Sequence, residues 1–419
     1  MNKSQKNDAA LLQSSTLPEG WHKVRFGDVT KKISKIVDQR NCDLDRFVAG
    51  GHMQTDDFRI KEWGTIDEGY LGPAFNHKFT KGQILYGSRR TYLRKVSIPH
   101  FDGVCANTTF VIEPTGNDLI PELLPFVMQS AGFNDHSIRM SKGSTNPYIN
   151  WKDIACYEFA IPEKEQQRRI ATTLWVAEDC IVKGERFVVT AERGKQLLMR
   201  ELFRKGIGNT EFTEVKGFGK VPKGWEVVPF QNLYAQPSII GLFKGAEFIG
   251  RGFKLVKMTE FFKGDILGSE CADRMEVSEN EQKKYSLKSD DLLFGRRSLN
   301  IEGAGKCVLV PKIKETLIFE SSIIRTTLNQ KIASPYFYLS YFNGWGRSQI
   351  KRIIRSVAAS GITSTDLASL LVPKPPLPEQ RQIASILTRC DETIAAARAN
   401  VGAAKALKMK MINEMISPT

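Results

Sequence analysis

The chain has 419 residues, enough for two or three domains that each bury a core of their own. Hydrophobic residues make up 41% and aromatic residues 10% of it, which excludes general disorder. No apolar run reaches the ~18 residues that a membrane-spanning helix needs, so the sequence predicts no membrane partner. Sixty Lys and Arg against 46 Asp and Glu leave a net charge of +14. This excess favours a polyanionic partner such as nucleic acid over a basic but merely solvated surface.

The first residues and the cysteines predict where the protein works. Residues 1–16 are polar, do not contain the apolar core of a secretion signal, and are expected to form a flexible tail. The 7 cysteines are scattered and contain no Cys-x-x-Cys pair, which is typical of a reduced cytoplasmic protein. The 5 histidines are equally scattered, so we predict no structural metal site.

Three landmarks occur twice along the chain. Pro-x-Gly-Trp ends at Trp21 and again at Trp225, 204 residues later. An aromatic-Gly pair followed by arginines begins at Tyr86 and at Phe294, 208 residues apart, and a Gln-Arg-x-Ile-Ala motif recurs at an offset of 213. The slowly growing offset indicates a duplicated unit with small insertions in its loops. A period this long predicts two tandem domains instead of a solenoid.

The two globular segments, residues 17–160 and 216–375, are predicted to be mixed α and β domains in an α+β fold. Their strand order is not readable from the sequence. Residues 31–80 and 234–288 have little in common, so we expect the two domains to bind different ligands through them. The predicted strands are Gln83–Tyr86, Phe110–Glu113, Asp291–Phe294 and Ser322–Arg325, and the predicted short helices are Pro121–Ser130 and Pro335–Tyr341.

The other two segments, 161–215 and 376–419, are predicted to be long helices. Pro162-Glu163 and Pro378-Glu379 are expected to open them, because proline suits a first helical turn and a carboxylate suits the positive helix end. The first copy has three more residues between its proline and Gln-Arg, so its helix is expected to begin a turn earlier. The proline-rich stretch 372–376 is expected to be a stiff junction, neither helix nor central strand.

Both helices carry small or apolar residues at alternating spacings of four and three, which is typical of a coiled coil. Lys195 and Lys408 interrupt the two patterns at the same slot, 213 residues apart. We therefore predict one intramolecular antiparallel helix pair with an approximate two-fold axis; the alternative is that each helix packs only on its own domain. The predicted seam consists of Ile170, Leu174, Ala177, Ile181, Gly184, Val188, Ala191, Leu198 and Leu202 in the first helix, and Ile383, Leu387, Cys390, Ile394, Ala397, Val401, Ala404, Met411 and Met415 in the second. Its centre is small (Gly184, Ala191, Ala397, Ala404), which permits close approach.

Candidate nucleic-acid contacts lie in the loops. Arginines can grip a guanine edge or a phosphate with two parallel hydrogen bonds. Small polar residues with free backbone amides suit phosphate contacts. For any single arginine a surface salt bridge remains the alternative, and for the small polar runs an ordinary turn. The predicted DNA-binding residues are Arg89, Arg90, Arg94, Lys142, Ser144 and Asn146 in the first domain and Arg296, Arg297, Ser360 and Thr363 in the second, with run 142–146 matched to run 360–364.

Motifs for catalysis are incomplete. Gly305-Lys306-Cys307 does not have the first glycine or the hydroxyl of a phosphate-binding loop. Asn146-Pro147-Tyr148 resembles an amino-methyltransferase signature only in part, and we interpret it as a turn. Glu281-Gln282-Lys283 after Asp265 could imitate a nuclease metal site but lies in a charged, loose segment. We therefore predict no catalytic residue, no metal site and no cofactor on this chain.

The doubled order of Pro-x-Gly-Trp, Pro-Glu, Gln-Arg and Ile-Ala over nearly the whole chain resembles the specificity subunit of type I restriction–modification enzymes. The matching helix motifs are residues 162–171 and 377–384. The resemblance implies that each globular segment is a target recognition domain that reads half of an asymmetric, split site in double-stranded DNA. The helices would be spacers that dock two methyltransferase subunits in a bacterial or archaeal cytoplasm.

On the same resemblance, the methyltransferase subunits bring S-adenosylmethionine and methylate adenine, and restriction subunits bring ATP and Mg for translocation and cleavage. The alternatives are a single-chain DNA methyltransferase or nuclease with a degenerate site, and a scaffold that binds no DNA. If both domains face one side of a duplex, their centres should lie about one helical turn apart, ~34–36 Å, and helix length should control the number of unspecified base pairs.

Overall fold

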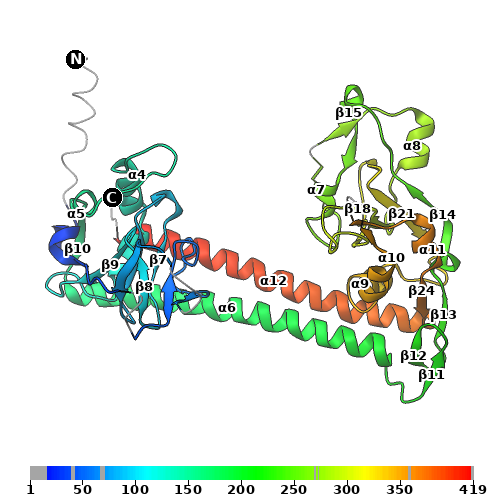
Figure 1. Ribbon diagram of the computed structural model, residues 1–419, viewed down its shortest axis with the longest axis horizontal. Helices are drawn as coiled ribbons and strands as arrows, with labels where there is room; N and C mark the ends of the chain where they lie inside the picture. Colours follow the sequence, from blue (N-terminus) through cyan, green and yellow to red (C-terminus); the bar gives the residue numbers. More distant parts are fainter. Residues whose placement is uncertain are drawn as a thin grey trace. The chain divides into compact units, whose positions relative to one another are not determined.

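The chain divides into two compact units in the computed structural model. The first unit combines residues 1–186 with 398–419, and the second is the continuous stretch 187–397. Each unit therefore holds one globular domain and one half of each long helix (Figure 1). The structure describes residues 17–38, 43–66, 71–268, 270–271, 273–356 and 360–416, so the predicted tail 1–16 lies outside the described residues. Within these ranges no helix is long and apolar enough to cross a membrane.

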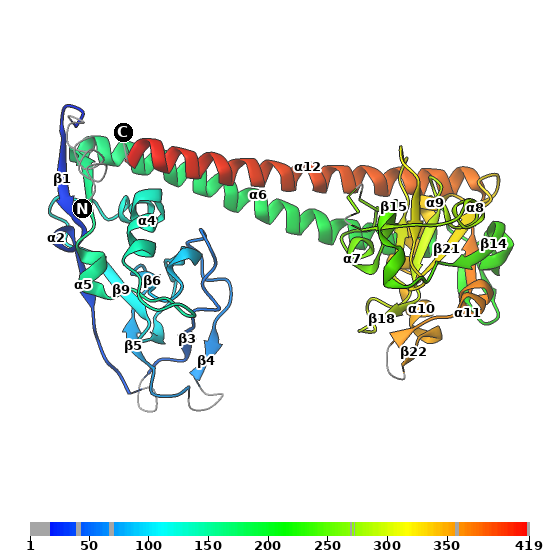
Figure 2. The same ribbon diagram turned by 90° about the horizontal axis from the view of Figure 1, so that it is seen from above.

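The globular domain of the first unit is built on two four-stranded sheets, and it lies to one side of the long helix (Figure 2). The antiparallel sheet has the order β2-β9-β6-β7 and the other sheet β4-β3-β8-β5. A separate antiparallel pair, β1-β10, joins the start of the domain to its end. The strands are β1 (Trp21–Arg25), β2 (Thr30–Ile33), β3 (Arg46–Val48), β4 (Gly64–Thr65), β5 (Phe75–Phe79), β6 (Ile84–Gly87), β7 (Val96–Ser97), β8 (Gly103–Ala106), β9 (Thr109–Pro114) and β10 (Glu158–Pro162).

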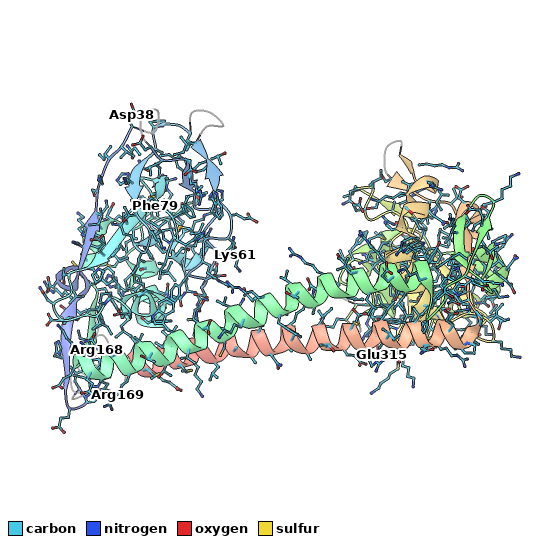
Figure 3. The ribbon with its side chains drawn as sticks, turned by 90° about the horizontal axis from the view of Figure 1, so that it is seen from below. Asp38, Lys61, Phe79, Arg168, Arg169 and Glu315 are labelled. Carbon is cyan, nitrogen blue, oxygen red and sulfur yellow. The ribbon has the colours of Figure 1, made fainter. Side chains whose placement is uncertain are left out.

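Alternation along β6 places its side chains in two cores, because successive residues of a strand point to opposite faces. Ile84 and Tyr86 pack among the short helices, whereas Leu85 packs with Val48 and Phe79 of the other sheet. All five are at most 4% exposed, and Figure 3 shows Phe79 inside the domain. The central sheet is thus covered on both faces. The short helices are α2 (Phe26–Val29), η2 (Thr91–Leu93), α3 (Leu124–Gln129), α4 (Ala131–Arg139) and α5 (Trp151–Ala155).

The second unit repeats this plan with an antiparallel sheet of order β14-β21-β17-β19 and a smaller sheet β16-β15-β20. It adds the small sheet β18-β23-β22 and the two-stranded sheets β11-β12 and β13-β24. The strands are β11 (Phe212–Val215), β12 (Gly219–Pro222), β13 (Glu226–Pro229), β14 (Tyr234–Ile240), β15 (Ile249–Val256), β16 (Arg274–Met275), β17 (Leu292–Gly295), β18 (Arg297–Ser298), β19 (Cys307–Leu309), β20 (Leu317–Phe319), β21 (Ile323–Leu328), β22 (Arg355–Ser356), β23 (Ser360–Gly361) and β24 (Leu371–Lys374). The short helices are η3 (Phe230–Leu233), η4 (Ala246–Phe248), α7 (Met258–Phe261), α8 (Glu279–Tyr285), α9 (Pro335–Asn343), α10 (Arg347–Ile353) and α11 (Ser364–Ser369).

The two segments that differ most in sequence, 31–80 and 234–288, share a strand arrangement that could not be predicted from their sequences. β3 pairs antiparallel with β4 and parallel with β8, and β15 pairs antiparallel with β16 and parallel with β20. Residues 31–80 and 234–288 thus differ in sequence, but the strands β3 and β15 that they contain are paired in the same way. Short strands can keep their pairing while nearly every exposed side chain changes, because backbone hydrogen bonds make the ladder.

Several predicted boundaries need correction. The four predicted strands lie in β6, β9, β17 and β21, whose bounds differ from the predicted ones by one to three residues. The first predicted short helix begins at Leu124 instead of Pro121, whereas α9 begins at Pro335 as predicted. Residues 371–374 form β24, paired at the edge of a two-stranded sheet, so the proline-rich stretch is only partly a junction. Proline is tolerated there because an edge strand need not donate every amide.

The long helices are α6 (Lys164–Lys205) and α12 (Leu377–Ile416). Pro162 does not open α6; it is the last residue of β10, and its true counterpart is Pro375. The carbonyl of each accepts a 2.8 Å hydrogen bond from the side-chain amide of Gln167 or Gln380. Both helices begin three residues before that glutamine, so the predicted extra turn in the first helix is wrong.

Within each unit the two helices contact each other with opposite chain directions. In the first unit Gly184 meets Val401, where an added Cβ would lie 2.7 Å from Cγ2, and Glu178 pairs with Lys408. In the second unit Lys195 pairs with Asp391. The predicted seam residues Ile170, Leu174, Ile181, Ile383, Leu387 and Ile394 are buried, and Gly184, Val188, Ala191, Ala397, Val401, Ala404 and Met411 are half-buried.

Two parts of the predicted seam differ from the structure. Leu198 is 37% exposed, and the neighbouring Leu202 and Phe203 are buried against the second domain instead. At the end of α12, Ile412 is fully buried in the first domain's core while Met411 is only partly buried there. A straight helix drifts from a strict seven-residue repeat, so the face that meets the domain shifts by a residue near the helix ends.

Candidate nucleic-acid interface

Two predicted clusters of the first domain meet at one edge. Arg89 forms a β-bridge with Tyr148, and the backbone amide of Arg90 donates to the carbonyl of Pro147 at 2.6 Å. Lys142 and Tyr148 exchange hydrogen bonds of 2.8 and 2.9 Å, which close an exposed turn that presents Gly143 to Asn146. The fold thus gathers the residues Arg89, Arg90, Lys142, Ser144 and Asn146.

The second domain makes the same arrangement. Arg297 of β18 pairs with Gly361 of β23, and the amide of Ile362 donates to the carbonyl of Arg296 at 3.0 Å. In the first domain the amide of Ile149 donates to the carbonyl of Ser88 at 2.9 Å. Both domains therefore place a basic pair after the central strand beside the segment that leads into a short helix.

This correspondence corrects the matching of the two polar runs. Ile149 corresponds to Ile362 at the offset of 213, so Lys142 corresponds to Arg355 and not to Ser360. The counterpart of run 142–146 is 355–359, of which 357–359 lie outside the described residues. The match to run 360–364 was wrong because it followed small polar composition instead of the helix offset.

The same offset reveals a pair of ion pairs that the sequence reasoning missed. Lys142 Nζ lies 2.9 Å from Asp153 Oδ2, and Arg355 Nη2 lies 2.9 Å from Asp366 Oδ2. In each domain a cation at the start of the turn is thus tied to the first turn of the following helix. The signal was present, since all four residues stand at the offset of 213.

Not every predicted arginine is available to a ligand. Arg94 pairs with Asp56, and Arg296 Nη1 donates to the carbonyl of Ser321 at 3.1 Å. Burial, with a smaller contribution from the charge of Arg297, lowers the pKa of Arg296 below its ordinary value. By contrast Arg89, Arg90 and Arg297 are exposed and form no ion pair with any described acidic residue. Three free guanidinium groups, two in one domain and one in the other, therefore face solvent.

The turn that carries the first arginines has an unusual backbone. Arg90 and Arg94 have φ angles of 49° and 46°, in the left-handed region. This conformation costs a non-glycine residue roughly 1–2 kcal/mol, so surrounding contacts must hold it. The amides of Leu93 and Arg94 donate back to the carbonyls of Arg90 and Thr91 at 2.8 and 2.9 Å. The direction of Arg90 is therefore fixed by the fold.

Two predicted contacts of the second domain have structural roles. The Thr363 hydroxyl accepts from the amide of Asp366 at 3.0 Å and caps α11, a role that Asn150 has by position in α5. Ser360 is 9% exposed in the small sheet, and its backbone pairs with Ser298. Sequence composition could not separate a helix cap from a phosphate contact, because both use small hydroxyl residues.

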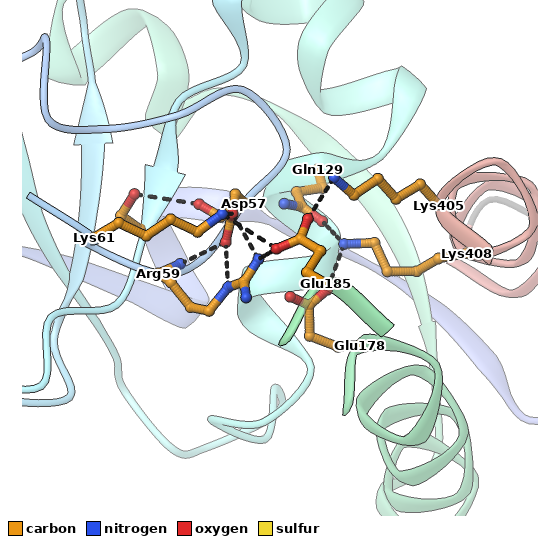
Figure 4. A network of polar contacts seen from close by, with 9 residues as sticks. Asp57, Arg59, Lys61, Gln129, Glu178, Glu185, Lys405 and Lys408 are labelled. Atoms are coloured by element: carbon orange, nitrogen blue, oxygen red, sulfur yellow. Dashed lines mark hydrogen bonds and ion pairs between the residues drawn. The ribbon is translucent and has the colours of Figure 1, made fainter. Parts of the chain in front are cut away.

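A second polar cluster lies where the first domain meets α6 and α12 (Figure 4). Arg59 donates to Glu185 at 2.6 Å and to both oxygens of Asp57 at 2.8 Å, and Lys405 reaches Glu185 at 2.6 Å. Burial opposes ionisation of Asp57, but hydrogen bonds from Arg59 and Lys61 lower its pKa to about 2. Burial likewise opposes ionisation of Glu185, and its bonds from Lys405 and Arg59 lower its pKa to about 2. Glu185 of α6 thus connects the first domain to Lys405 of α12, and Asp57 holds Arg59 in position for this contact.

The acidic residues that could imitate a nuclease metal site have other partners in the structure. Glu281 caps α8 and pairs with Lys244 at 2.7 Å, and Asp265 lies 3.7 Å from Lys306. Asn146-Pro147-Tyr148 belongs to the exposed turn described above. Across the described part of the chain, no group of three or more His, Cys, Asp or Glu side chains is placed to hold a metal ion.

Comparison with known proteins identifies the family. The family described as Type I restriction modification DNA specificity domain matches residues 18–184 and 245–401, which together make up most of the chain. The type I restriction enzyme MjaVIII specificity subunit of Methanocaldococcus jannaschii is 23% identical over 278 residues, 66% of this chain and 65% of that protein. That match spans just under two thirds of the relative. The MjaX specificity subunit of the same organism is 21% identical over 96% of this chain and 94% of its own length.

Solved structures agree on the fold. A chain from a type I R-M system studied for its complex assembly and conformational transition has a TM-score of 0.62 at 18% identity, covering 97% of this chain and 100% of that one. The type I restriction–modification S subunit from M. genitalium has a TM-score of 0.54 at 11% identity, covering 97% and 99%. The chain therefore belongs to the type I restriction modification DNA specificity domain family, and the curated relatives named above are specificity subunits of type I restriction enzymes.

Proposed function

We propose that this chain binds double-stranded DNA and reads an asymmetric site in two parts, one part with each globular domain, in the cytoplasm of a bacterial or archaeal host. The observation that carries the proposal is the edge that both domains repeat, where two free arginines lie beside an exposed turn in the first domain and one free arginine lies beside β23 in the second. Arg89 and Arg90 meet turn 142–148, and Arg297 meets β23. Guanidinium groups with no acidic partner are suited to phosphates and guanine edges.

The framework around these edges is shared, and the side chains on them are not. Ser88 corresponds to Arg296, and Tyr148 corresponds to Gly361. Because each base pair offers a different pattern of donors and acceptors in the major groove, different side chains on the same framework should read different bases. The two halves of the site are therefore expected to differ in sequence.

The test begins by co-expressing the chain with its cognate methyltransferase subunit and mapping methylated adenine by long-read sequencing. A two-part site with an unspecified spacer is expected. Arg89→Ala/Arg90→Ala should weaken binding to that site by about tenfold to a hundredfold and reduce the dependence of affinity on salt. Arg297→Ala should act on the other half-site.

Lys31→Ala is the matched control, because Lys31 is an exposed cation of the same domain that is already paired with Glu113 at 3.1 Å. It should leave affinity within about twofold. Three results would contradict the proposal: purified chain that methylates or cuts DNA alone, binding that does not weaken with added salt, and a methylated site without two parts. The first favours an enzyme and the second a scaffold.

We infer further that α6 and α12 form one antiparallel coiled-coil spacer with pseudo-two-fold symmetry whose length sets the number of unspecified base pairs. The helices have 42 and 40 residues, and they contact each other antiparallel inside each unit. Seven residues inserted after Arg186 and after Ala397 would leave the contacts inside each unit intact, since these are the unit boundaries.

Seven helical residues add ~10 Å at ~1.5 Å each, about three base pairs at ~3.4 Å. The mapped spacer should lengthen accordingly while both half-sites stay the same. An insertion into α6 alone should abolish methylation, because the two helices would no longer match. A spacer unchanged by the double insertion would overturn this part of the proposal.

The long helices also offer surface for partner subunits. Val176, Phe187, Val189 and Leu197 of α6 are 46–63% exposed, more apolar surface than a helix facing only water needs. We propose that two methyltransferase subunits dock along the helices, that they carry S-adenosylmethionine, and that restriction subunits carry ATP and Mg. Phe187→Glu should then reduce co-purification of the methyltransferase subunit without changing the fold, which circular dichroism would check.

A further inference from the structure

Among the described residues of the two candidate edges, Tyr92 and Leu299 are the most exposed apolar or aromatic side chains. Leu299 follows Arg297 by two residues and is 100% exposed. Tyr92 lies three residues after Arg89, in the turn that carries Arg90, and is 51% exposed. Other exposed leucines among the described residues are at most 63% exposed. Leu299 therefore has unusually little protein around it, and it sits beside a free arginine.

The turn that displays Leu299 is held rigidly. Arg347 of α10 donates to the carbonyls of Ile301, Glu302 and Ala304 at 3.1, 2.6 and 2.8 Å. The amide of Gly303 donates to Asn300 Oδ1 at 2.8 Å. These four bonds order the backbone that directly follows Leu299. The Leu299 side chain is thus fully exposed to water in the folded chain.

The turn that displays Tyr92 is held in a comparable way. Thr91 Oγ1 lies 2.9 Å from Ser141 Oγ, and Arg94 pairs with Asp56. The left-handed residues Arg90 and Arg94 flank the turn on both sides. The two domains thus use different braces to present an apolar or aromatic side chain two residues after a free arginine, Tyr92 after Arg90 and Leu299 after Arg297.

We propose that Leu299 and Tyr92 contact the bases of the half-sites read by their own domains, Leu299 by apolar contact and Tyr92 by stacking. This inference rests on the proposed function. The free arginines would bind the phosphates and bring this edge of the domain to the DNA. The neighbouring apolar or aromatic side chain would then be buried against the bases. Leucine is among the side chains used as wedges between base steps, and apolar groups also recognise the thymine methyl. Aromatic rings stack on any base.

The test uses the chain co-purified with its methyltransferase subunit and two duplexes, one with the mapped site and one with that site scrambled. Leu299→Ala should weaken binding to the site by about tenfold or more and leave binding to the scrambled duplex within about twofold. Leu299→Met should retain most of the affinity. Phe212→Ala removes an exposed apolar side chain of β11 in the same unit; it is the matched control and should leave both affinities unchanged.

Methylation mapping adds a second readout. Leu299→Ala should relax sequence preference in one half-site only, and Tyr92→Ala in the other half-site only. Equal weakening on both duplexes, no weakening at all, or loss of the methyltransferase subunit from the purified Leu299→Ala complex would overturn the inference while the proposed function stands. A wild-type complex that does not distinguish the two duplexes would overturn both.

Discussion

The two units tie their helices together with the same ion pair but surround it differently. Lys408 pairs with Glu178 at 2.7 Å in the first unit, and Lys195 pairs with Asp391 at 2.5 Å in the second. Each lysine and each acid stands at the offset of 213 from its counterpart. The side chains of the first pair are 3% and 8% exposed, and those of the second are 21% and 43% exposed. Both halves have thus kept the ion pair, but it is buried in the first unit and partly exposed to water in the second.

The globular domains cause this difference. Lys408 Nζ lies 5.0 Å from the centre of the Phe58 ring and 3.2 Å from Gln129 Oε1, so the first domain closes over it. In the second unit the Tyr336 hydroxyl donates to Asp391 and leaves the pair half open. The first unit also carries the Asp57, Arg59 and Glu185 cluster beside its pair. An ion pair at equivalent positions therefore contributes differently to the stability of each unit.

The largest expected effect comes from removing one member of the buried pair. Lys408→Met should destabilise the first unit by about 3–5 kcal/mol, because Glu178 is left buried without a counter-charge. Lys195→Met should cost the second unit about 1 kcal/mol or less, because its pair is partly in water. Urea unfolding with hydrogen exchange read separately on residues 164–186 and 187–205 would give both values.

A double variant separates charge from packing. Lys408→Met with Glu178→Leu should recover most of the lost stability, since an apolar pair of similar volume replaces a buried ion pair at little cost. If Lys408→Met and Lys195→Met destabilised their units equally, burial would not be the difference between them.

The next effect should be the same in both halves. Gln167 and Gln380 are fully buried, and each accepts from one backbone amide and donates to two backbone carbonyls of its own domain at 2.7–3.0 Å. Gln167→Ala and Gln380→Ala should each cost about 2–3 kcal/mol, because buried backbone groups lose their partners.

The exposed neighbours Arg168, which Figure 3 labels at the start of α6, and Arg381 are the matched controls. Their alanine variants should change the free energy of unfolding by less than about 0.5 kcal/mol. If only one of the two glutamine variants lowered the free energy of unfolding, the Gln-Arg motif would have different roles in the two halves.

Much of this framework could be predicted from the sequence, because it is carried by repeated residues. The offset of 213 already contained the lysine slot, and it would also have yielded the acidic partners Glu178 and Asp391. The second sheets could not be matched, because β3 and β15 keep their pairing through backbone bonds and share few side chains. The hydrogen bonds that order the turn after Leu299 could not be predicted either. Their donor, Arg347, lies 48 residues after Leu299 and reaches the carbonyl of Ile301 only in the folded chain.

The smallest effect concerns pH, and the first unit should show more of it than the second. The pKa values of Asp57 and Glu185 are lowered to about 2 in the folded chain from ordinary values of 3.8 and 4.5. A lowered pKa means that the ionised form favours folding, so this stability is present above about pH 5 and is lost as pH falls toward 2. In the second unit burial raises the pKa values of Asp291 and Glu320, so these two groups favour folding more as pH falls.

We expect the first unit to lose on the order of 2 kcal/mol of stability relative to the second between pH 5 and pH 2.5. Hydrogen exchange at stepped pH would measure this loss, and Glu185→Gln should remove most of it. Equal acid sensitivity of the two units would show that the Asp57 and Glu185 cluster does not set the difference between them.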